Sequence, residues 1–370
     1  MNNFGLRCYY KMLPQTNNYS LFTIHCSLFI NRLIQVVFIV NLNYAIIGTG
    51  WIAKAFTDGM KIASGISPYA VYSRTEEKGR SFASSVGAEK VFTNLEEMAC
   101  SEEIEAVYIA SPNAFHYAQS KLFLEHGKHV ICEKPITVEP EEFEELFSLA
   151  KSKKLVYMEA IMMMHFSNRK VIENALKKLG KITTARIDFS QLSSKYPALK
   201  RGELPNIFNP EMATGSLMDL GVYNVYFALY YFGIPERVTS TAFMLETGAD
   251  GAGTAVLHYP DKQVTLTYSK LGQSRTGTEI YGDEGTLFVE SISKLTNVKF
   301  IHNDGTEETV AGDTEKEEVM SGEAGDFLKY ISDYEGNKEA YFACAETALS
   351  VSRIMKEIRL QNGIKYTSEI

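Results

Sequence analysis

The chain has 370 residues, of which 45% are hydrophobic and 22% are charged. This length predicts two domains, and the apolar fraction is sufficient for two hydrophobic cores. Disordered, collagen-like and coiled-coil proteins are excluded by the composition. The 37 Lys and Arg against 45 Asp and Glu give a net charge of −8, without a basic cluster. A nucleic acid is therefore not an expected partner.

The cysteines and histidines bear on metal binding and on the compartment. Five cysteines are scattered along the chain without a CxxC pair, which is typical neither of a disulfide framework nor of a zinc site. The seven histidines lack HExxH or comparable ligand spacing. The composition predicts a reduced, cytoplasmic protein without a bound metal.

Residues 1–40 differ from the rest of the chain. Arg7 and Lys11 precede an apolar stretch at 21–40, which is interrupted by polar residues. One hypothesis is a signal peptide or membrane anchor, and the other is a start-site artefact in which translation begins near Val40. No small-x-small cleavage site precedes the domain. We favour the artefact, because the residues that follow begin a domain outright. Residues 1–40 are then outside the fold and no membrane is expected as a partner, whereas a native segment would imply a membrane-anchored enzyme.

From Asn41 to about residue 160, short apolar runs alternate with helical patterns. The first run is Tyr44–Ile47, and a helix to about Ile62 follows its glycine loop. A second helix is expected over Glu76–Val86. Further strands are predicted at residues 69–72, 91–92, 106–110, 129–132 and 156–158. Alternating strands and helices predict a doubly wound parallel sheet covered on both faces.

The loop after the first strand has a G-x-G-x-x-A pattern, formed by Gly48, Thr49, Gly50, Trp51, Ile52 and Ala53. Gly48 permits the tight turn, Gly50 lets the backbone approach a pyrophosphate, and Ala53 allows close helix–strand packing. A tight turn without a ligand is the alternative interpretation. The strand before the loop and the helix after it favour dinucleotide binding.

The end of the second strand bears on the choice of cofactor. An NAD site usually places Asp or Glu about twenty residues after the glycine loop, where it binds the ribose 2′-hydroxyl. Here the position is Ser73, followed by Arg74. A hydroxyl and a guanidinium suit a 2′-phosphate, which a carboxylate would repel. NADP is therefore favoured over NAD, although an ordinary solvated loop would look the same.

Several further motifs resemble the glucose–fructose oxidoreductase, inositol dehydrogenase and rhizopine-catabolism (Gfo/Idh/MocA) family. The matching segments are the glycine loop, Ser111-Pro112-Asn113 with His116, residues 127–130 leading into Glu133-Lys134-Pro135, residues 215–223 and residues 363–366. The likeness extends from about Asn41 to the C-terminus. It implies a Rossmann domain at 41–160 and a substrate-binding α+β domain at 161–370, with a large, open, mostly antiparallel sheet.

Lys134 is the strongest candidate for a catalytic residue. It follows the predicted strand at 129–132, and ligands of open α/β sheets bind at the carboxyl ends of the strands. A cation at that place polarises a substrate oxygen. An ordinary surface lysine is the alternative. In the family that the sequence resembles, the matching lysine is catalytic.

Asp219 and Tyr223 are four residues apart in an otherwise apolar helical stretch, so they share one face. A carboxylate there is costly unless it is paired or faces a polar site. Tyr223 could equally be a packing residue. Many relatives have His at this position, and Tyr resembles the glucose–fructose oxidoreductase and dihydrodiol dehydrogenase branches. In those branches the tyrosine serves as proton donor and acceptor. In this chain a nearby Lys134 ammonium would help by stabilising the Tyr223 phenolate.

The resemblance also implies contacts with the cofactor. The residues concerned, besides the glycine loop, Ser73 and Arg74, are Ser111, Pro112, Asn113, His116, Glu133 and Lys134. Asn113 as a helix N-cap and His116 as a helix-surface residue are open alternatives. The chain departs from many relatives at Met162–Met164, where neither the Arg nor the Pro of an Arg-aromatic-x-Pro segment is present. This methionine run is more typical of adaptable packing.

After a helix at 168–179, the second half is predicted to form strands at 182–189, 237–245, 254–258, 264–268, 276–281 and 286–289, with a hairpin turn at 282–285. A long amphipathic helix is expected at 339–361. Sequential antiparallel strands leave one sheet face open. The resemblance implies that this face forms a homodimer or a higher oligomer.

Together these features predict an NADP-dependent oxidoreductase, with NAD possible, that acts on a sugar, cyclic polyol or related diol. Lys134 and Tyr223 would handle the hydroxyl proton and Asp219 would orient them. The alternative is a non-catalytic dinucleotide-binding sensor or regulatory protein on the same fold.

Overall fold

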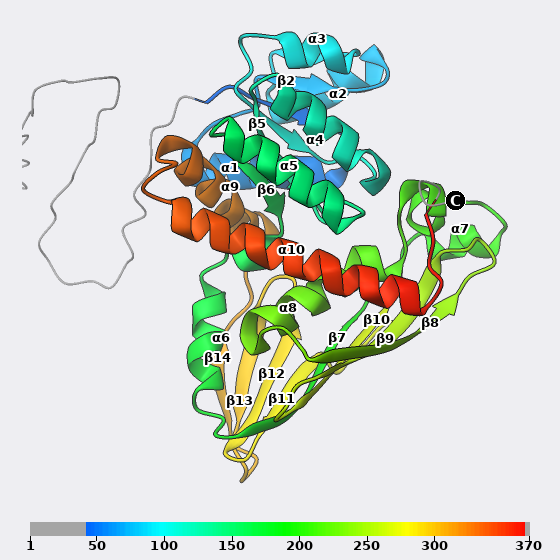
Figure 1. Ribbon diagram of the computed structural model, residues 1–370, viewed down its shortest axis with the longest axis vertical. Helices are drawn as coiled ribbons and strands as arrows, with labels where there is room; N and C mark the ends of the chain where they lie inside the picture. The colour runs from blue at the N-terminus through cyan, green and yellow to red at the C-terminus, as the bar shows by residue number, and fades with distance from the viewer. Residues whose placement is uncertain (1–41, 367–370) are drawn as a thin grey trace, which may run out of the picture. The chain divides into compact units, whose positions relative to one another are not determined.

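The computed structural model describes residues 42–366, whose strands form two sheets (Figure 1). The hypotheses on residues 1–40 fall outside the described residues. The first sheet is parallel throughout, with strand order β3-β2-β1-β4-β5-β6. Its strands are β1 (Tyr44–Ile47), β2 (Ala70–Tyr72), β3 (Lys90–Phe92), β4 (Ala106–Ile109), β5 (His129–Glu133) and β6 (Tyr157–Ala160). This confirms the doubly wound sheet.

Helices cover both faces of the first sheet, so its central strands are buried along their whole length, as in β1 and β4. These helices are α1 (Trp51–Ser64), α2 (Glu76–Val86), α3 (Leu95–Cys100), α4 (His116–Glu125) and α5 (Pro140–Ser152). The short turn η1 (Asn113–Phe115) precedes α4. Helix α5 begins with a capping box in which Glu139 and Glu142 exchange hydrogen bonds with each other's backbone.

The second sheet has eight strands in the order β14-β13-β12-β11-β7-β10-β9-β8. They are β7 (Ile182–Ser190), β8 (Arg237–Met244), β9 (Asp250–His258), β10 (Gln263–Ser269), β11 (Thr278–Gly282), β12 (Gly285–Ser291), β13 (Thr296–Ile301) and β14 (Glu307–Ala311). The large, mostly antiparallel sheet is confirmed, and so is the 282–285 turn between β11 and β12. Among the strands described, its one parallel pair is β7 with β10, because β10 inserts beside β7 rather than following it along an antiparallel meander.

Helices cover one face of the second sheet. In Figure 1, α8 (Val222–Phe232) and α10 (Lys338–Gln361) lie along that face, and α6 (Asn168–Leu176) lies towards its β13–β14 end. Asn224 fixes α8 to the sheet by donating from Nδ2 to the carbonyls of Ile187 (3.0 Å) and Thr267 (2.9 Å). Shorter elements are η2 (Met162–Met164), α7 (Tyr196–Lys200), η3 (Asn206–Phe208), η4 (Pro210–Met212) and the π-helical turn η5 (Leu217–Gly221).

Helix α9 (Lys316–Ser332) joins the two halves of the chain and was missed from the sequence, as were β13 and β14. It packs against α1, and Gly59 permits the approach, because a Cβ there would lie 3.0 Å from the backbone of Met320. Helix α10 also reaches the first sheet: the Tyr341 hydroxyl accepts from Tyr157 N at 2.8 Å. Helices α9 and α10, from the C-terminal part of the chain, thus pack against the first sheet and its helix α1.

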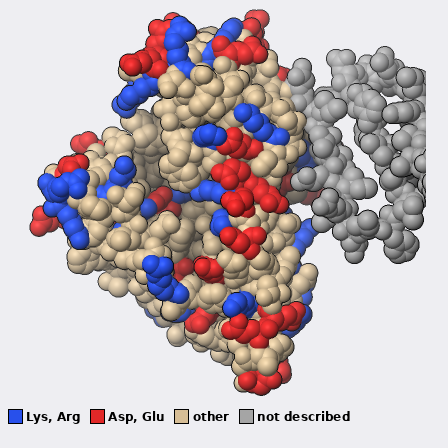
Figure 2. All heavy atoms as spheres, turned by 180° about the vertical axis from the view of Figure 1, so that it is seen from behind, with Lys and Arg blue, Asp and Glu red and all other residues tan. Residues whose placement is uncertain are grey.

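The surface carries charges of both signs. On the face shown in Figure 2, Lys and Arg are interspersed with Asp and Glu over most of the described surface. No helix among residues 42–366 is long and apolar enough to cross a membrane.

Candidate active site

Lys134, Asp219 and Tyr223 meet where the two halves of the chain join. Lys134 follows β5, Asp219 lies in η5, and Tyr223 is in the first turn of α8. Lys134 Nζ donates to Asp219 Oδ1 and to the Asp219 carbonyl, both at 2.9 Å. The same ammonium lies 5.2 Å from the centroid of the Tyr223 ring. Two segments 85 residues apart in sequence therefore form one polar cluster.

A second lysine completes this cluster. Lys270 follows β10, and its Nζ forms an ion pair with Asp219 Oδ2, on the carboxylate oxygen that Lys134 does not contact. Only 8% of the Lys270 side chain is exposed, against 13% for Lys134. Asp219 is thus held between two ammonium groups, one from each sheet.

The backbone around Asp219 is fixed by the second sheet. Asp250, at the start of β9, is fully buried, and its Oδ2 accepts from Leu217 N at 2.7 Å. Gly221 packs against the ring of Tyr268, where an added Cβ would lie 3.2 Å from ring atoms. Since π-helical turns are rare and often mark functional sites, η5 is notable for carrying Asp219. Sheet packing therefore sets where this carboxylate points.

Burial and charge shift the pKa values of these groups in different directions. Burial alone would raise the pKa of Asp219, but the Lys134 and Lys270 ammoniums outweigh it and hold that pKa well below its usual range. Burial would lower the pKa of Lys134, but Asp219, Tyr223 and Glu133 raise it overall. For Tyr223, burial raises the pKa and exceeds the opposing effect of Lys134. At neutral pH Asp219 is therefore a carboxylate, Lys134 an ammonium and Tyr223 a neutral phenol.

Tyr223 is available to a ligand. Its ring packs edge-on against Phe189, with centroids 5.5 Å apart, and 8% of the residue is exposed. Within residues 42–366, no hydrogen bond engages its hydroxyl. A phenol in this state can exchange a proton with a substrate oxygen beside Lys134.

The glycine loop fits the pyrophosphate of a dinucleotide. Gly48 has φ +110°, and a Cβ there would lie 2.6 Å from the Ala110 carbonyl oxygen. A Cβ on Gly50 would meet no atom within 4 Å, so the backbone faces open space at the start of α1. The first turn of α1 has no acidic residue, and its N-terminal N–H groups favour an anion. Thr49 and Trp51 are exposed, Ile52 is half-buried and Ala53 is buried.

A charged group from α9 adjoins this loop. Lys316 Nζ lies 4.1 Å from the centroid of a Trp51 ring. Glu133 is buried and accepts from the Tyr108 hydroxyl at 2.5 Å. Burial raises the pKa of Glu133 despite Lys134 and Lys316, and it raises the pKa of the neighbouring Glu323 further. The site therefore has acidic and basic groups that come from α9 as well as from β5.

The Ser111–His116 segment is held by hydrogen bonds within the protein. Ser111 Oγ donates to Gln119 Oε1 at 2.7 Å, and Pro112, half-buried, is the residue before η1. Asn113 Nδ2 donates to the Ala213 carbonyl at 2.8 Å, so it bridges to the second half instead of capping α4. His116 is completely buried, which contradicts the helix-surface alternative. Its ring nitrogens lie 2.8 Å from Pro135 O and 2.9 Å from Ser111 O.

Ser73 and Arg74 lie at the carboxyl end of β2. Ser73 is buried, and its amide donates to Phe92 O at 3.1 Å. Arg74 is exposed and forms no ion pair with any described residue. Its guanidinium is therefore free to contact a phosphate.

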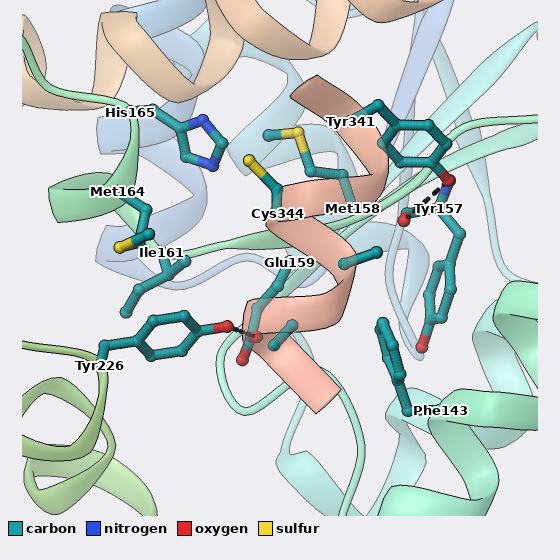
Figure 3. Close-up of a pocket in the computed structure, with 12 residues that line it drawn as sticks. Phe143, Tyr157, Met158, Glu159, Ile161, Met164, His165, Tyr226, Tyr341 and Cys344 are labelled. Carbon is teal, nitrogen blue, oxygen red and sulfur yellow. Dashed lines mark hydrogen bonds between the residues drawn. The ribbon is translucent and has the colours of Figure 1, made fainter. Parts of the chain in front are cut away.

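A small cavity is lined by side chains from β6, α5, α8 and α10, among other residues (Figure 3). Its volume of about 20 Å³ is enough for a single water molecule. Glu159, on β6, accepts hydrogen bonds there from the Tyr226 hydroxyl and, at 2.9 Å, from Ile136 N. Met162–Met164 are all buried in the cores, as the packing interpretation predicts.

Lys270, Lys316 and Glu323 were missed from the sequence. A signal existed for Lys270, since Val264, Leu266 and Tyr268 point inward and Lys270 continues that alternation. Glu323 similarly interrupts the apolar face of a helix that was not predicted. Among the described residues, no group of three His, Cys, Asp or Glu side chains is placed to hold a metal ion.

Each half of the chain matches a domain model of the same protein family. Residues 42–161 match the model of the Gfo/Idh/MocA oxidoreductase family with an NAD-binding Rossmann fold, and residues 169–288 match the C-terminal domain model of that family. Together the two models cover more than half of the chain.

Individual relatives align over nearly their whole length. The scyllo-inositol 2-dehydrogenase (NADP(+)) IolU of Bacillus subtilis (strain 168) is 38% identical over 328 residues, covering 89% of this chain and 99% of the relative. The trans-1,2-dihydrobenzene-1,2-diol dehydrogenase of Xenopus laevis is 26% identical, covering 87% and 98%. The 3-ketoreductase KijD10 of Actinomadura kijaniata, solved with NADP and TDP-benzene, shares the fold with a TM-score of 0.75 at 20% identity, covering 87% and 98%.

Proposed function

The chain belongs to the Gfo/Idh/MocA family of oxidoreductases, and on that premise we propose that it is an NADP-dependent dehydrogenase or reductase acting on a sugar, cyclic polyol or related diol. The observation that carries the proposal is the meeting of Lys134, Asp219 and Tyr223 in one polar cluster at the carboxyl end of the parallel strand β5. The names of the relatives support the substrate class, since they include an inositol dehydrogenase and a dihydrodiol dehydrogenase.

Tyr223 exchanges the proton of the substrate hydroxyl. Its pKa is raised by burial, so the phenol is the resting form and donates a proton when a carbonyl is reduced. In the reverse direction it accepts the hydroxyl proton, and the Lys134 ammonium stabilises the resulting negative charge. Asp219 fixes Lys134 in place through the 2.9 Å hydrogen bond.

The cofactor supplies or accepts the hydride at its nicotinamide ring. The loop from Gly48 to Ile52 holds the pyrophosphate, with Gly50 leaving space for it. Ser73 and Arg74 bind the 2′-phosphate, which makes NADP the preferred cofactor. Ser111, Pro112 and Asn113 form the wall beside the nicotinamide ribose together with Glu133, and the buried His116 holds this segment through Pro135 O and Ser111 O.

A non-catalytic sensor on the same fold is the second candidate. A pure binding protein has no need for a buried ammonium, a carboxylate and a free phenol in one cluster. The enzyme is therefore the better supported of the two. The discriminating experiment is turnover of a panel of aldoses, inositols and dihydrodiols with the Lys134→Met variant as comparison.

Lys134→Met is expected to lose most turnover, because the reacting oxygen loses its nearest cation, while NADPH binding persists. A loss of about 100-fold or more is in the range for removal of one electrostatic contact to a developing charge. Turnover and calorimetric binding are measured on the same preparations. Unchanged turnover would remove Lys134 from the mechanism.

The cofactor preference is tested by titration. Trp51 is the only tryptophan in the chain and lies in the glycine loop, so its emission reports a bound reduced nicotinamide. NADPH should quench it at lower concentration than NADH. Arg74→Ala should weaken NADPH by about 10- to 100-fold and leave NADH unchanged, since it removes one charge-assisted contact to phosphate. The exposed Arg80, paired with Glu76, is the matched control.

We also propose that the protein is a cytoplasmic homodimer formed through the second sheet. Support comes from the outer face of that sheet, where residues such as Val256 and Phe288 are half-exposed and no described helix lies. The three cysteines within the described part of the chain are free thiols, in keeping with a reducing compartment.

A further inference from the structure

Lys270 occupies a position where a lysine is costly. Val264, Leu266 and Tyr268 of β10 are completely buried on the inner face of the sheet, and Lys270 continues that series. Only 7% of the residue is exposed. A buried ammonium needs a partner of opposite charge to offset its lost hydration. Asp219 is that partner.

The backbone of Lys270 is anchored on both sides. Its amide donates to the Gly251 carbonyl at 2.9 Å, and its own carbonyl accepts from Ser193 N at 2.9 Å. Gly251 adjoins Asp250, which holds the amide of Leu217 at the start of η5. Neighbouring strands therefore fix both the turn that carries Asp219 and the lysine that contacts its carboxylate.

The charges of Lys134, Asp219 and Lys270 together determine the electric field at a nearby substrate oxygen. Lys134 and Asp219 alone form a neutral pair, whose field at a nearby oxygen is small. Lys270 contacts the other carboxylate oxygen, so the three groups together carry one net positive charge. Because Lys134 and Lys270 are largely buried, that charge is less screened than in water and acts on a developing oxyanion.

We propose that Lys270 is a positioning residue of the catalytic centre, which holds Asp219 and offsets its charge so that Lys134 acts on the substrate oxygen as an uncompensated cation. This inference rests on the proposed function. Lys270 acts through Asp219, whereas a merely structural ion pair would affect stability and leave the chemical step alone.

A double-mutant cycle over Lys270 and Asp219 tests the inference. Lys270→Met should lower kcat about tenfold or more, the change that corresponds to one pKa unit in the ionisation of the reacting group. In the Asp219→Asn background the same substitution should lower kcat by less than about threefold, because the residue has nothing left to act through. KM and the NADPH dissociation constant should stay unchanged, and Lys270→Arg should restore most of the loss.

Lys262 provides a matched control. It immediately precedes β10, at the opposite end of the strand, and it pairs with the exposed Asp261. Lys262→Met should leave kcat unchanged. Equal losses from Lys270→Met in both backgrounds, or a loss confined to KM, would overturn the positioning role.

Thermal unfolding of the wild type, Lys270→Met, Asp219→Asn and the double variant needs no substrate. It distinguishes failure of the Lys270 inference from failure of the proposed function. Non-additive shifts in Tm support the Lys270–Asp219 contact even if wild-type turnover is absent, in which case the proposed function fails and the catalytic role of Lys270 fails with it. Additive Tm shifts would overturn the contact itself. Coupling in Tm with additive effects on kcat would leave Lys270 as a structural residue only.

Discussion

At the scale of single residues, the surroundings of Tyr223 determine the pKa of its hydroxyl. A free tyrosine has a pKa of about 10. The Lys134 ammonium is expected to lower the pKa of Tyr223, and it does act in that direction. Burial in the apolar helix is the larger effect, however, so the pKa of Tyr223 rises overall. The group is therefore suited to donating a proton at neutral pH.

This raised pKa gives opposite pH dependences for the two directions of reaction. Reduction needs the neutral phenol, so its kcat/KM should be level from about pH 6 to 9 as far as Tyr223 is concerned. Oxidation needs the phenolate, so its kcat/KM should rise with pH, by up to about tenfold per unit. Tyr223→Phe should lower both by about 10²- to 10⁴-fold and abolish the slope. Profiles in both directions check this, and a slope that survives in the Phe variant would assign it to another group.

At the scale of elements, Glu159 joins β6 to the loop after Lys134 and to α8. Its carboxylate accepts from Ile136 N and from the Tyr226 hydroxyl. Burial raises the pKa of Glu159 to about 7 against these two hydrogen bonds. The carboxyl is therefore more easily protonated in the folded protein than in the unfolded chain, where the ordinary value is 4.5. Because of this difference in pKa, the free energy of unfolding depends on pH.

The stability that protonated Glu159 contributes is present below about pH 4.5 and is lost as the pH rises through about 7. Glu159→Gln removes this loss because its side chain does not ionise. The unfolding free energy of the variant, minus that of the wild type, should therefore increase between these pH values by up to about 3 kcal/mol. Denaturant titrations at several pH values measure it, with the exposed Glu102→Gln as control. A difference that is flat with pH would contradict the assignment.

At the scale of the whole molecule, the two faces of the second sheet differ. Helices α8 and α10 bury the inner face, where Leu257, Leu266 and Leu287 have no exposed surface. The outer face mixes charged and hydroxyl side chains with half-exposed apolar ones such as Val256 and Phe288. Such a face is well suited to a partner of the same kind, as proposed above.

Phe288→Glu should therefore convert a dimer to a monomer, because a carboxylate at a self-complementary interface meets its own copy across the two-fold axis. Light scattering should give twice the chain mass for the wild type and once that mass for the variant. The exposed Phe243, on the edge strand β8, is a control for the loss of an aromatic ring. A monomeric wild type would reject the dimer outright.

Local patterns in the sequence are enough for the first sheet, for helices α1 and α2 beside it and for the long helix α10. The run Tyr44–Ile47, its glycine loop and the helix Glu76–Val86 are defined by neighbours in sequence, and the structure places them at or close to the expected bounds. Asp219 was identified because a carboxylate in an apolar helix needs a partner. Lys134 was identified because it ends a buried strand and because the motif resembles a known family.

Long-range packing decided the rest. The parallel pairing of β7 with β10 joins residues about 80 positions apart, and no local periodicity encodes a register between them. Helix α9 was missed because its apolar face is interrupted by Glu323 and completed only against α1. The same holds for the polar cluster at the candidate site. The sequence by itself determined that Lys134, Asp219 and Tyr223 are candidates, through a strand end and a carboxylate in an apolar helix, because these are local patterns. Only the tertiary structure brought Lys270 to Asp219 and set the balance of burial and charge on Tyr223.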